Sequence, residues 1–267
     1  NDVIRTNAGF IIGDSRGFGT TASGGGRDRI TALNSFATNP TVVGDSWGET
    51  LVRGGGNDSL VVEGTFGGIG DSASNASGAD VRGGGNDSIK ALSGGLAIGD
   101  SASNLGDAAG GGNDKLTVGG TPAADRKIIG DSSAVGTARG GGKDVIRSTG
   151  PGGDDFFGDS YATNGNALLS GADSIFLGPG EDTATGDSFS DLGVATGGAP
   201  DLIRGGPSND WLRGDHFASG STEGGPDRLF GEGGADTLNG EARRDLCDGG
   251  LGSPDTQTAC EIRLRIP

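Results

Sequence analysis

The sequence predicts an all-β fold, a parallel β-roll or β-helix solenoid of about eight to nine rungs. Three observations predict this fold. An acidic motif recurs along nearly the whole chain at an almost constant step. Glycine makes up 59 of the 267 residues, far above its usual share of about 7%. A branched aliphatic residue follows each glycine cluster at fixed spacing. A period of roughly 20–50 residues, held from end to end, is typical of solenoids.

Each repeat carries aspartate in two positions. In the first, aspartate follows glycine in a Gly-Asp-Ser motif, or Gly-Asp-His in the last copy, at steps of 26 to 31 residues. These residues are Asp14, Asp45, Asp71, Asp100, Asp131, Asp159, Asp187 and Asp215. In the second, aspartate follows a glycine-rich run at steps of 26 to 30 residues, namely Asp28, Asp58, Asp87, Asp114, Asp144, Asp173, Asp201 and Asp227. Coiling would superpose equivalent positions, so each set is predicted to form a ladder of carboxylates.

Residues 140–160 show how one rung is expected to form. The glycines at 140–142 predict a tight turn, because glycine permits backbone conformations that other residues avoid. A strand is expected at 145–147 with Ile146 facing inward, then a turn at 150–154 and an opposing strand at 156–157. In all eight repeats, Ile or Leu stands two residues after the second aspartate. We therefore expect two short strands per rung around a narrow aliphatic core, with enlarged polar loops such as 73–77 along one edge.

Composition limits the size of the core and the kinds of partner. Only 31% of residues are hydrophobic and 5% aromatic, which is too few for a large compact core. Because the repeat covers nearly the whole chain, we expect one elongated domain over 1–267, with repeats at 1–246 and a C-terminal segment and terminal strand at 247–267. No run of about 18 apolar residues occurs, so membrane insertion is not expected. The net charge of −16 and pI near 4.3 argue against nucleic acid and anionic membranes as partners.

The same acidity creates a folding problem. Stacked rungs lie about 4.8 Å apart, so acidic turns would bring like charges into direct opposition. Cations are therefore expected between the rungs, and eight divalent ions would bring +16, equal to the formal deficit. Ca²⁺ prefers carboxylate and carbonyl oxygens, which a glycine-rich turn with an adjoining aspartate supplies. Both aspartate sets flank the same expected loop, so we expect them to line one side of the roll. An aspartate in Gly-Asp-Ser could alternatively cap a turn through hydrogen bonds to the backbone.

Over essentially residues 1–260 the chain resembles the RTX, or haemolysin-type, calcium-binding repeat, whose nonapeptide is Gly-Gly-x-Gly-x-Asp-x-Leu-x. The closest matches are Gly-Gly-Pro-Ser-Asn-Asp-Trp-Leu-Arg at 205–213 and Gly-Glu-Gly-Gly-Ala-Asp-Thr-Leu at 231–238. The resemblance implies a parallel β-roll with Ca²⁺ bound between successive turns, on the order of eight ions or more. An ordinary rung of that family has 18 residues, whereas the repeats of this chain have 26 to 31.

The family's aspartate position on the opposite edge is occupied only in the later rungs. Aspartate stands there at Asp154, Asp182, Asp210 and Asp236. The equivalent turns at 66–68 and 93–95 have no aspartate. We therefore expect calcium on this second edge only in the C-terminal half.

The two cysteines, Cys247 and Cys260, lie 13 residues apart near the C-terminal end of the sequence. Their spacing permits a disulfide that would stabilise the last loop by roughly 3 kcal/mol. A disulfide implies an oxidising, extracellular location. The opening Asn-Asp-Val-Ile has the character of a mature terminus from which a secretion leader has been removed. The expected localisation is therefore secreted or extracellular.

The favoured function is a non-enzymatic, secreted calcium-binding structural protein. The unpaired end rungs predict head-to-tail association of copies into a filament or a matrix or surface scaffold, with polysaccharide as a further partner. Alternatively, the terminal strand at 261–266 folds over the last rung beside the disulfide. The alternative is a calcium-binding module of a larger secreted toxin or hydrolase, aiding secretion and folding. A β-helical enzyme acting on polysaccharide is less favoured, because its candidate aromatic platforms, Trp47, Trp211 and Tyr161, are scattered along the sequence.

Overall fold

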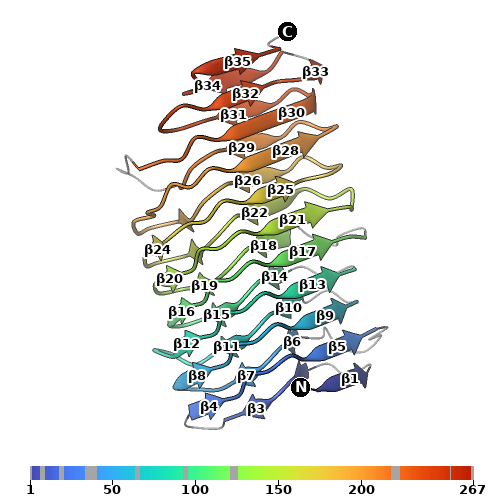
Figure 1. The fold of residues 1–267 in the computed structure, drawn as a ribbon, viewed down its shortest axis with the longest axis vertical. Coiled ribbons are helices and arrows are strands. Elements are labelled where there is room, and N and C mark those ends of the chain that lie inside the picture. The colour runs from blue at the N-terminus through green and yellow to red at the C-terminus, as the bar shows by residue number, and fades with distance from the viewer. Residues whose placement is uncertain are drawn as a thin grey trace.

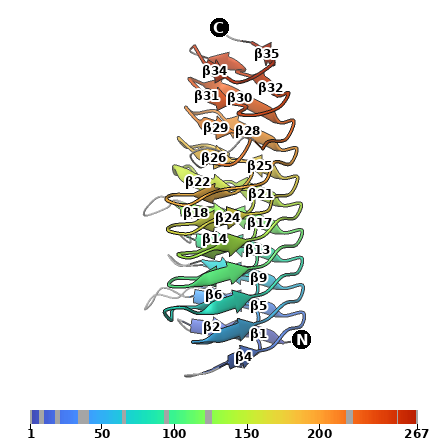
Figure 2. The same cartoon turned by 90° about the vertical axis from the view of Figure 1, so that its left-hand side faces the viewer.

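A computed structural model of the protein describes residues 2–6, 10–17, 21–33, 41–63, 67–92, 96–120, 126–217, 223–252 and 254–265. These residues form a parallel β-solenoid whose chain climbs steadily from one end to the other (Figures 1 and 2). All strand pairings between successive rungs are parallel, and the described residues contain no helix, so none there could cross a membrane. The expected all-β solenoid is confirmed.

The strands stack into four sheets, named A to D in the order in which the chain visits them. Sheet A contains β1 (Val3–Thr6), β5 (Arg29–Ala32), β9 (Ser59–Val62), β13 (Ser88–Ala91), β17 (Lys115–Val118), β21 (Val145–Ser148), β25 (Ser174–Phe176), β28 (Leu202–Gly206), β30 (Arg228–Gly234), β32 (Leu246–Asp248) and β35 (Ile262–Leu264), with β33 (Leu251–Gly252) also paired to β30. Sheet B contains β2 (Phe10–Ile12), β6 (Thr41–Val43), β10 (Gly68–Ile69), β14 (Leu96–Ile98), β18 (Arg126–Ile129), β22 (Asp154–Phe157), β26 (Thr183–Thr185), β29 (Trp211–Arg213), β31 (Thr237–Asn239) and β34 (Thr256–Thr258).

Sheets C and D are shorter stacks. Sheet C contains β3 (Ser15–Arg16), β7 (Ser46–Trp47), β11 (Ser72–Ser74), β15 (Ser101–Ser103), β19 (Ser133–Ala134), β23 (Tyr161–Ala162) and β27 (Phe189–Ser190). Sheet D contains β4 (Thr21–Ser23), β8 (Leu51–Arg53), β12 (Asp80–Arg82), β16 (Asp107–Ala109), β20 (Ala138–Arg139) and β24 (Ala167–Leu168). In Figure 1 they occupy the left side of the solenoid and are missing from its upper end.

Sheets A and B enclose the main aliphatic core. Equivalent residues superpose: Ile89 pairs with Leu60 below it and with Leu116 above it, and all three are buried. The inward residues of sheet B, among them Val42 and Ile128, close the other side of this core. Alternation along a strand sends every second side chain into the core, which explains why one aliphatic residue recurs at a fixed place in each repeat.

Sheets C and D enclose a second, thinner core built mainly from alanine. Ala108, Ala138 and Ala167 are buried between the two sheets, and Val52 and Val81 take this role in the early rungs. The expectation of enlarged polar loops was wrong, because segments such as Ser72–Ser74 form strands. Their small side chains let sheets C and D approach closely, so that alanine methyl groups are buried between them although the sequence of these strands is largely polar.

The rung count and rung length also differ from expectation. The solenoid has about seven full rungs, matching the seven strands of sheet C, instead of eight to nine. Beyond β27, the described residues contain strands of sheets A and B only, and sheets C and D continue there as single bridges at Phe217 and Ala195. The step shortens there: equivalent aspartates Asp227 and Asp245 lie 18 residues apart, the length of an ordinary β-roll rung.

Candidate metal centre

The two aspartate sets meet at the waist between the two lobes of the solenoid. The Gly-Asp-Ser turn carries the chain from sheet B to sheet C, and the glycine-rich turn carries it from sheet D back to sheet A. Both turns therefore point their aspartates toward the same interior line. Of the 16 aspartates in these sets, 15 are at most 3% exposed, and Asp14 of the first rung is exposed.

In the N-terminal half the acids form four tight triplets. Each triplet combines a Gly-Asp-Ser aspartate, the second aspartate of the same rung, and the Gly-Asp-Ser aspartate of the next rung. One oxygen from each member lies within 4.8 Å of the others, in the sets Asp14 with Asp28 and Asp45, Asp45 with Asp58 and Asp71, Asp71 with Asp87 and Asp100, and Asp100 with Asp114 and Asp131. Two oxygens bound to one Ca²⁺ at about 2.4 Å can be at most about 4.8 Å apart. The triplet spacing thus fits one cation held between two rungs.

Backbone hydrogen bonds fix the second aspartate of every rung. The N–H of Asp58 donates to Oδ1 of Asp87 at 2.6 Å, and the N–H of Asp87 donates to Oδ1 of Asp114 at 2.7 Å. The same bond recurs up the row until the N–H of Asp227 donates to Oδ1 of Asp245. The other oxygen, Oδ2, is buried without a hydrogen-bond partner in Asp58, Asp87, Asp114, Asp144, Asp173, Asp201, Asp227 and Asp245.

The Gly-Asp-Ser aspartates do cap turns, but capping uses only part of their capacity. Oδ1 of Asp100 accepts from the N–H of Gly85 at 3.1 Å, and Oδ1 of Asp131 accepts from Gly112 at 3.2 Å. Oδ2 of both residues is buried without a partner, as are both carboxylate oxygens of Asp71. A buried oxygen that accepts nothing is unfavourable unless a cation or proton satisfies it. Turn capping alone therefore leaves the row unexplained.

Burial raises the pKa of many of these carboxyl groups above the ordinary value of 3.8, among them Asp71, Asp87 and Asp159. It raises the pKa of Asp71 to about 10, and the charges of Asp87 and Asp45 add to the effect. The pKa of Asp87 rises to about 8, through burial and then the charge of Asp114. In the upper rungs burial and the charge of Asp173 raise the pKa of Asp159 well above its usual range. Without a bound cation, Asp71 and Asp87 would therefore hold their protons at neutral pH.

The glycines beside the row leave no room for a side chain. A Cβ on Gly70 would lie 1.6 Å from the carbonyl oxygen of Gly99 and 2.2 Å from Oδ2 of Asp87. A carbonyl oxygen and a carboxylate oxygen therefore face the same small space. This donor set contains only oxygen, which suits Ca²⁺ with its six to eight flexible ligands better than Zn²⁺, which favours sulfur and nitrogen. Each added rung brings two carboxylates, so one divalent ion per rung would balance the charge.

A second row of aspartates runs along the A–B turn on the far side of the main core. The N–H of Asp154 donates to Oδ1 of Asp182 at 2.7 Å, and the pattern continues through Asp210 and Asp236 to Asp255. Oδ2 is buried without a partner in every member from Asp182 upward. The turns at 66–68 and 93–95, where we expected no calcium ligand, lie largely outside the residues that the structure describes.

Below Asp154 the second row ends in a built-in cation. The N–H of Arg126 points to Oδ1 of Asp154 in the register that an aspartate would otherwise hold. Its guanidinium lies 1% exposed and donates through Nε and Nη2 to the two oxygens of Asp154, at 2.8 and 2.5 Å, and through Nη1 to the carbonyl of Gly119. Asp154 is thus neutralised by a side chain, whereas the acids above it are not.

Comparison with family models, curated proteins and solved structures yields no match to this chain. What the structure establishes is a parallel β-solenoid with aspartate-rich turns about 28 residues apart, an arrangement consistent with an RTX-like β-roll. Buried acidic triplets that could hold metal ions are part of it.

Sequence reasoning missed three members of the rows. Asp245 and Asp255 extend the two rows, and Arg126 ends the second. The sequence signal was an aspartate followed two residues later by an inward side chain, but that side chain is Cys247 in one case and Gln257 in the other. Aligning the repeats by the aspartate alone would have found both, at a step of 18 residues from Asp227 to Asp245 and of 19 from Asp236 to Asp255.

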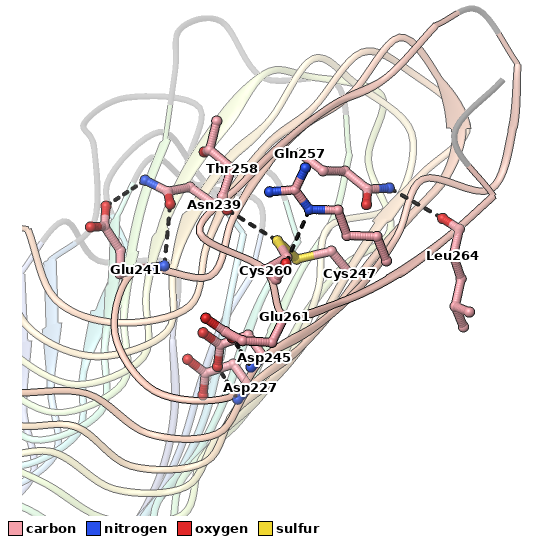
Figure 3. The surroundings of a disulfide bond; sticks show 11 residues. Asp227, Asn239, Glu241, Asp245, Cys247, Gln257, Thr258, Cys260, Glu261 and Leu264 are labelled. Atoms are coloured by element: carbon pink, nitrogen blue, oxygen red, sulfur yellow. Dashed lines mark hydrogen bonds between the residues drawn. A yellow bond between two sulfur atoms is a disulfide. The ribbon is translucent and has the colours of Figure 1, made fainter.

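Two further expectations concern the cysteines and the aromatic residues. Cys247 and Cys260 form a disulfide with their Cα atoms 5.9 Å apart, as expected (Figure 3). It ties β32 to the segment that leads into β35. Two of the aromatic platforms that are scattered along the sequence come together in the fold, because Tyr161 and Trp211 line one cavity.

Proposed function

We propose that this chain is a secreted, non-enzymatic calcium-binding structural protein of the RTX-like β-roll type, folded and made rigid by Ca²⁺. The observation that carries the proposal is the stack of acidic triplets in which one carboxylate oxygen of each member lies within 4.8 Å of the others. Such a stack is repulsive without cations and cohesive with them, so metal binding and folding would be one event. The disulfide Cys247–Cys260 supports an oxidising location outside the cell.

Two features support RTX-like character over a generic solenoid. The aspartates recur with glycine-rich turns in both rows, and the upper rungs shorten to the 18-residue step of an ordinary β-roll. The wider rungs below differ by the insertion of sheets C and D between the Gly-Asp-Ser turn and the following glycine run. In this proposal the chain is a β-roll formed by sheets A and B, to which sheets C and D add a second lobe.

The proposal includes association of copies end to end. Among the described residues, the outermost strands of sheet A are β1 and β35, and each has one edge without a neighbouring strand. Both present exposed apolar side chains, with Val3 71% and Leu264 44% exposed. An unpaired parallel edge of this kind can continue into the sheet of a second copy. Sheets A and B would then run on through the junction, giving a filament or matrix scaffold.

The calcium part is tested by counting bound ions. Protein dialysed against Ca²⁺ and analysed for metal content should hold on the order of one ion per Gly-Asp-Ser or Gly-Asp-His turn, about eight in all, with little Mg²⁺ in competition. A content below about two ions per chain would contradict the proposal.

The association part is tested separately by light scattering in Ca²⁺ at rising protein concentration. The expected mass grows with concentration in the parent chain and stays at one chain in the double variant Val3→Lys/Leu264→Lys. A parent chain that remains monomeric would remove the filament while leaving the calcium scaffold intact.

A further inference from the structure

The outer faces of sheets B and C meet in a concave corner that changes character along the solenoid. In the lowest rungs Trp47 packs on Phe10 in this corner, and in the middle rungs small and aliphatic side chains such as Ile98 and Ala102 fill it and are buried. In the upper rungs the corresponding residues are aromatic or charged, and the corner opens into a cavity of about 260 Å³. This cavity lies outside both aspartate rows.

Aromatic rings form one wall of the cavity as a stacked ladder. Tyr161, Phe189 and Phe217 are successive partners in register on sheet C. The rings of Tyr161 and Phe189 lie 5.7 Å apart at 18°, and those of Phe189 and Phe217 lie 4.9 Å apart at 19°. Opposite them on sheet B stands Trp211.

Two of these rings remain in contact with solvent. Trp211 is 51% exposed and Phe217 is 41% exposed. Packing does not require this, since the same corner is closed by aliphatic side chains a few rungs below. Exposed aromatic faces that converge on one cavity point to a ligand with an apolar face of its own.

The rim of the cavity is polar and balanced in charge. Nζ of Lys127 donates to the hydroxyl of Tyr161 at 2.6 Å, and that hydroxyl donates to Oδ2 of Asp191 at 2.6 Å. Asp155 lines the same cavity, and the guanidinium of Arg213 lies 4.1 Å from the ring centre of Phe217. Two cations and two carboxylates thus line the cavity, and Nε of Arg213 also lies 3.4 Å from Oε1 of Glu241 beside it.

This combination selects among ligand classes. A purely apolar ligand would remove the carboxylates and cations from water without replacing their hydrogen bonds. An anionic ligand would meet the two aspartates, and a cationic ligand would meet Lys127 and Arg213. A neutral ring with many hydroxyl groups satisfies both kinds of group, because each hydroxyl donates to a carboxylate and accepts from a cation.

We propose that this corner binds one ring of a neutral saccharide, with the C–H face of the sugar against Trp211 and Phe217 and its hydroxyls on the charged rim. The cavity volume is below the range of about 300–1,000 Å³ for drug-sized ligands, which fits a single ring of a longer chain that continues along the open corner. The site rests on the fold and requires no metal in the cavity.

Tryptophan fluorescence offers a direct test, because the chain has only two tryptophans. The variant Trp47→Phe leaves Trp211 as the sole reporter. Calcium-loaded protein would be titrated with neutral oligosaccharides of glucose, mannose, galactose and N-acetylglucosamine, with oligogalacturonate as the anionic comparison and 1-anilinonaphthalene-8-sulfonate as the apolar probe.

The expected result is a saturable change in Trp211 emission with at least one neutral oligosaccharide. Adding Phe217→Ala should weaken that binding at least about tenfold, because it removes one of the two exposed aromatic faces against which the sugar packs. Adding Leu192→Ala, which removes a 77% exposed apolar side chain not among those lining the cavity, should leave it unchanged. Saturation by oligogalacturonate or the apolar probe alone, or by none of the panel, would overturn the proposal. Calcium content is measured in the same samples, so failure here is distinguishable from failure of the calcium proposal.

Discussion

Acidification should stabilise the calcium-free protein, which is the reverse of ordinary acid denaturation. The reason lies in Asp87, Asp114 and Asp144, whose pKa values rise from 3.8 to about 8 through burial and the charge of a neighbouring aspartate. The folded state therefore binds these protons more tightly than the unfolded chain. The stabilisation is complete below about pH 4 and is lost as pH rises toward about 8.

The size of the effect follows from the shift. One pKa unit corresponds to 1.36 kcal/mol, so between about pH 8 and about pH 5 each such site contributes about 4 kcal/mol of added stability on acidification. Neighbouring sites are coupled, so their contributions do not simply add. Even one site would change the free energy of unfolding by a large fraction of a typical domain's stability.

Urea unfolding followed by far-ultraviolet circular dichroism, in chelator and across that pH interval, measures this directly. The calcium-saturated protein should show the opposite trend, because protons compete with Ca²⁺ for the same oxygens. If the free energy of unfolding of the calcium-free protein does not change with pH, or rises with pH, the aspartates of the rows do not have the raised pKa values on which this prediction depends.

Three substitutions test other parts of the account. Asp87→Asn should remove about one bound Ca²⁺, whereas Asp80→Asn, at an exposed ion pair, should remove none; equal losses by metal analysis would contradict the site assignment. Gly70→Ala should lower the free energy of unfolding of the calcium-loaded protein, measured in urea, by about 3 kcal/mol or more. The reason is that the added methyl group would lie 1.6 Å from the backbone oxygen of Gly99. A loss below about 1 kcal/mol would contradict this close packing. Arg126→Gln should lower the free energy of unfolding by about 3–5 kcal/mol, because it leaves the buried carboxylate of Asp154 unpaired. The control Arg204→Gln, which breaks an exposed ion pair, should lower it by less than about 1 kcal/mol. Similar losses in both variants would contradict the role of Arg126 as a buried counter-charge.

The sequence predicts those parts of the fold whose residues differ most in chemistry from their neighbours in the sequence. Ile89 and its equivalents mark sheet A because an aliphatic residue at a fixed distance from an aspartate is conspicuous in a glycine-rich chain. The carboxylate rows follow directly from superposing those repeats.

Sheets C and D could not be predicted in this way. Ser72–Ser74 and its equivalents alternate serine with alanine, residues of weak strand propensity, so neither periodicity nor composition distinguishes the strand from a loop. Their stability comes from neighbours in the stack, which a single repeat does not reveal. Arg126 was missed for a related reason: it replaces aspartate in register and shares no chemistry with it, so only the hydrogen bond to Asp154 exposes its position.

The central claim, that cations hold the rungs together, is tested most directly by following β-structure during removal and return of Ca²⁺ at neutral pH. Circular dichroism after exhaustive dialysis against chelator should show loss of the β signal. Added Ca²⁺ should restore it in one cooperative transition that Mg²⁺ at the same concentration does not reproduce. A chelated protein that keeps its full β signal at neutral pH would contradict the claim.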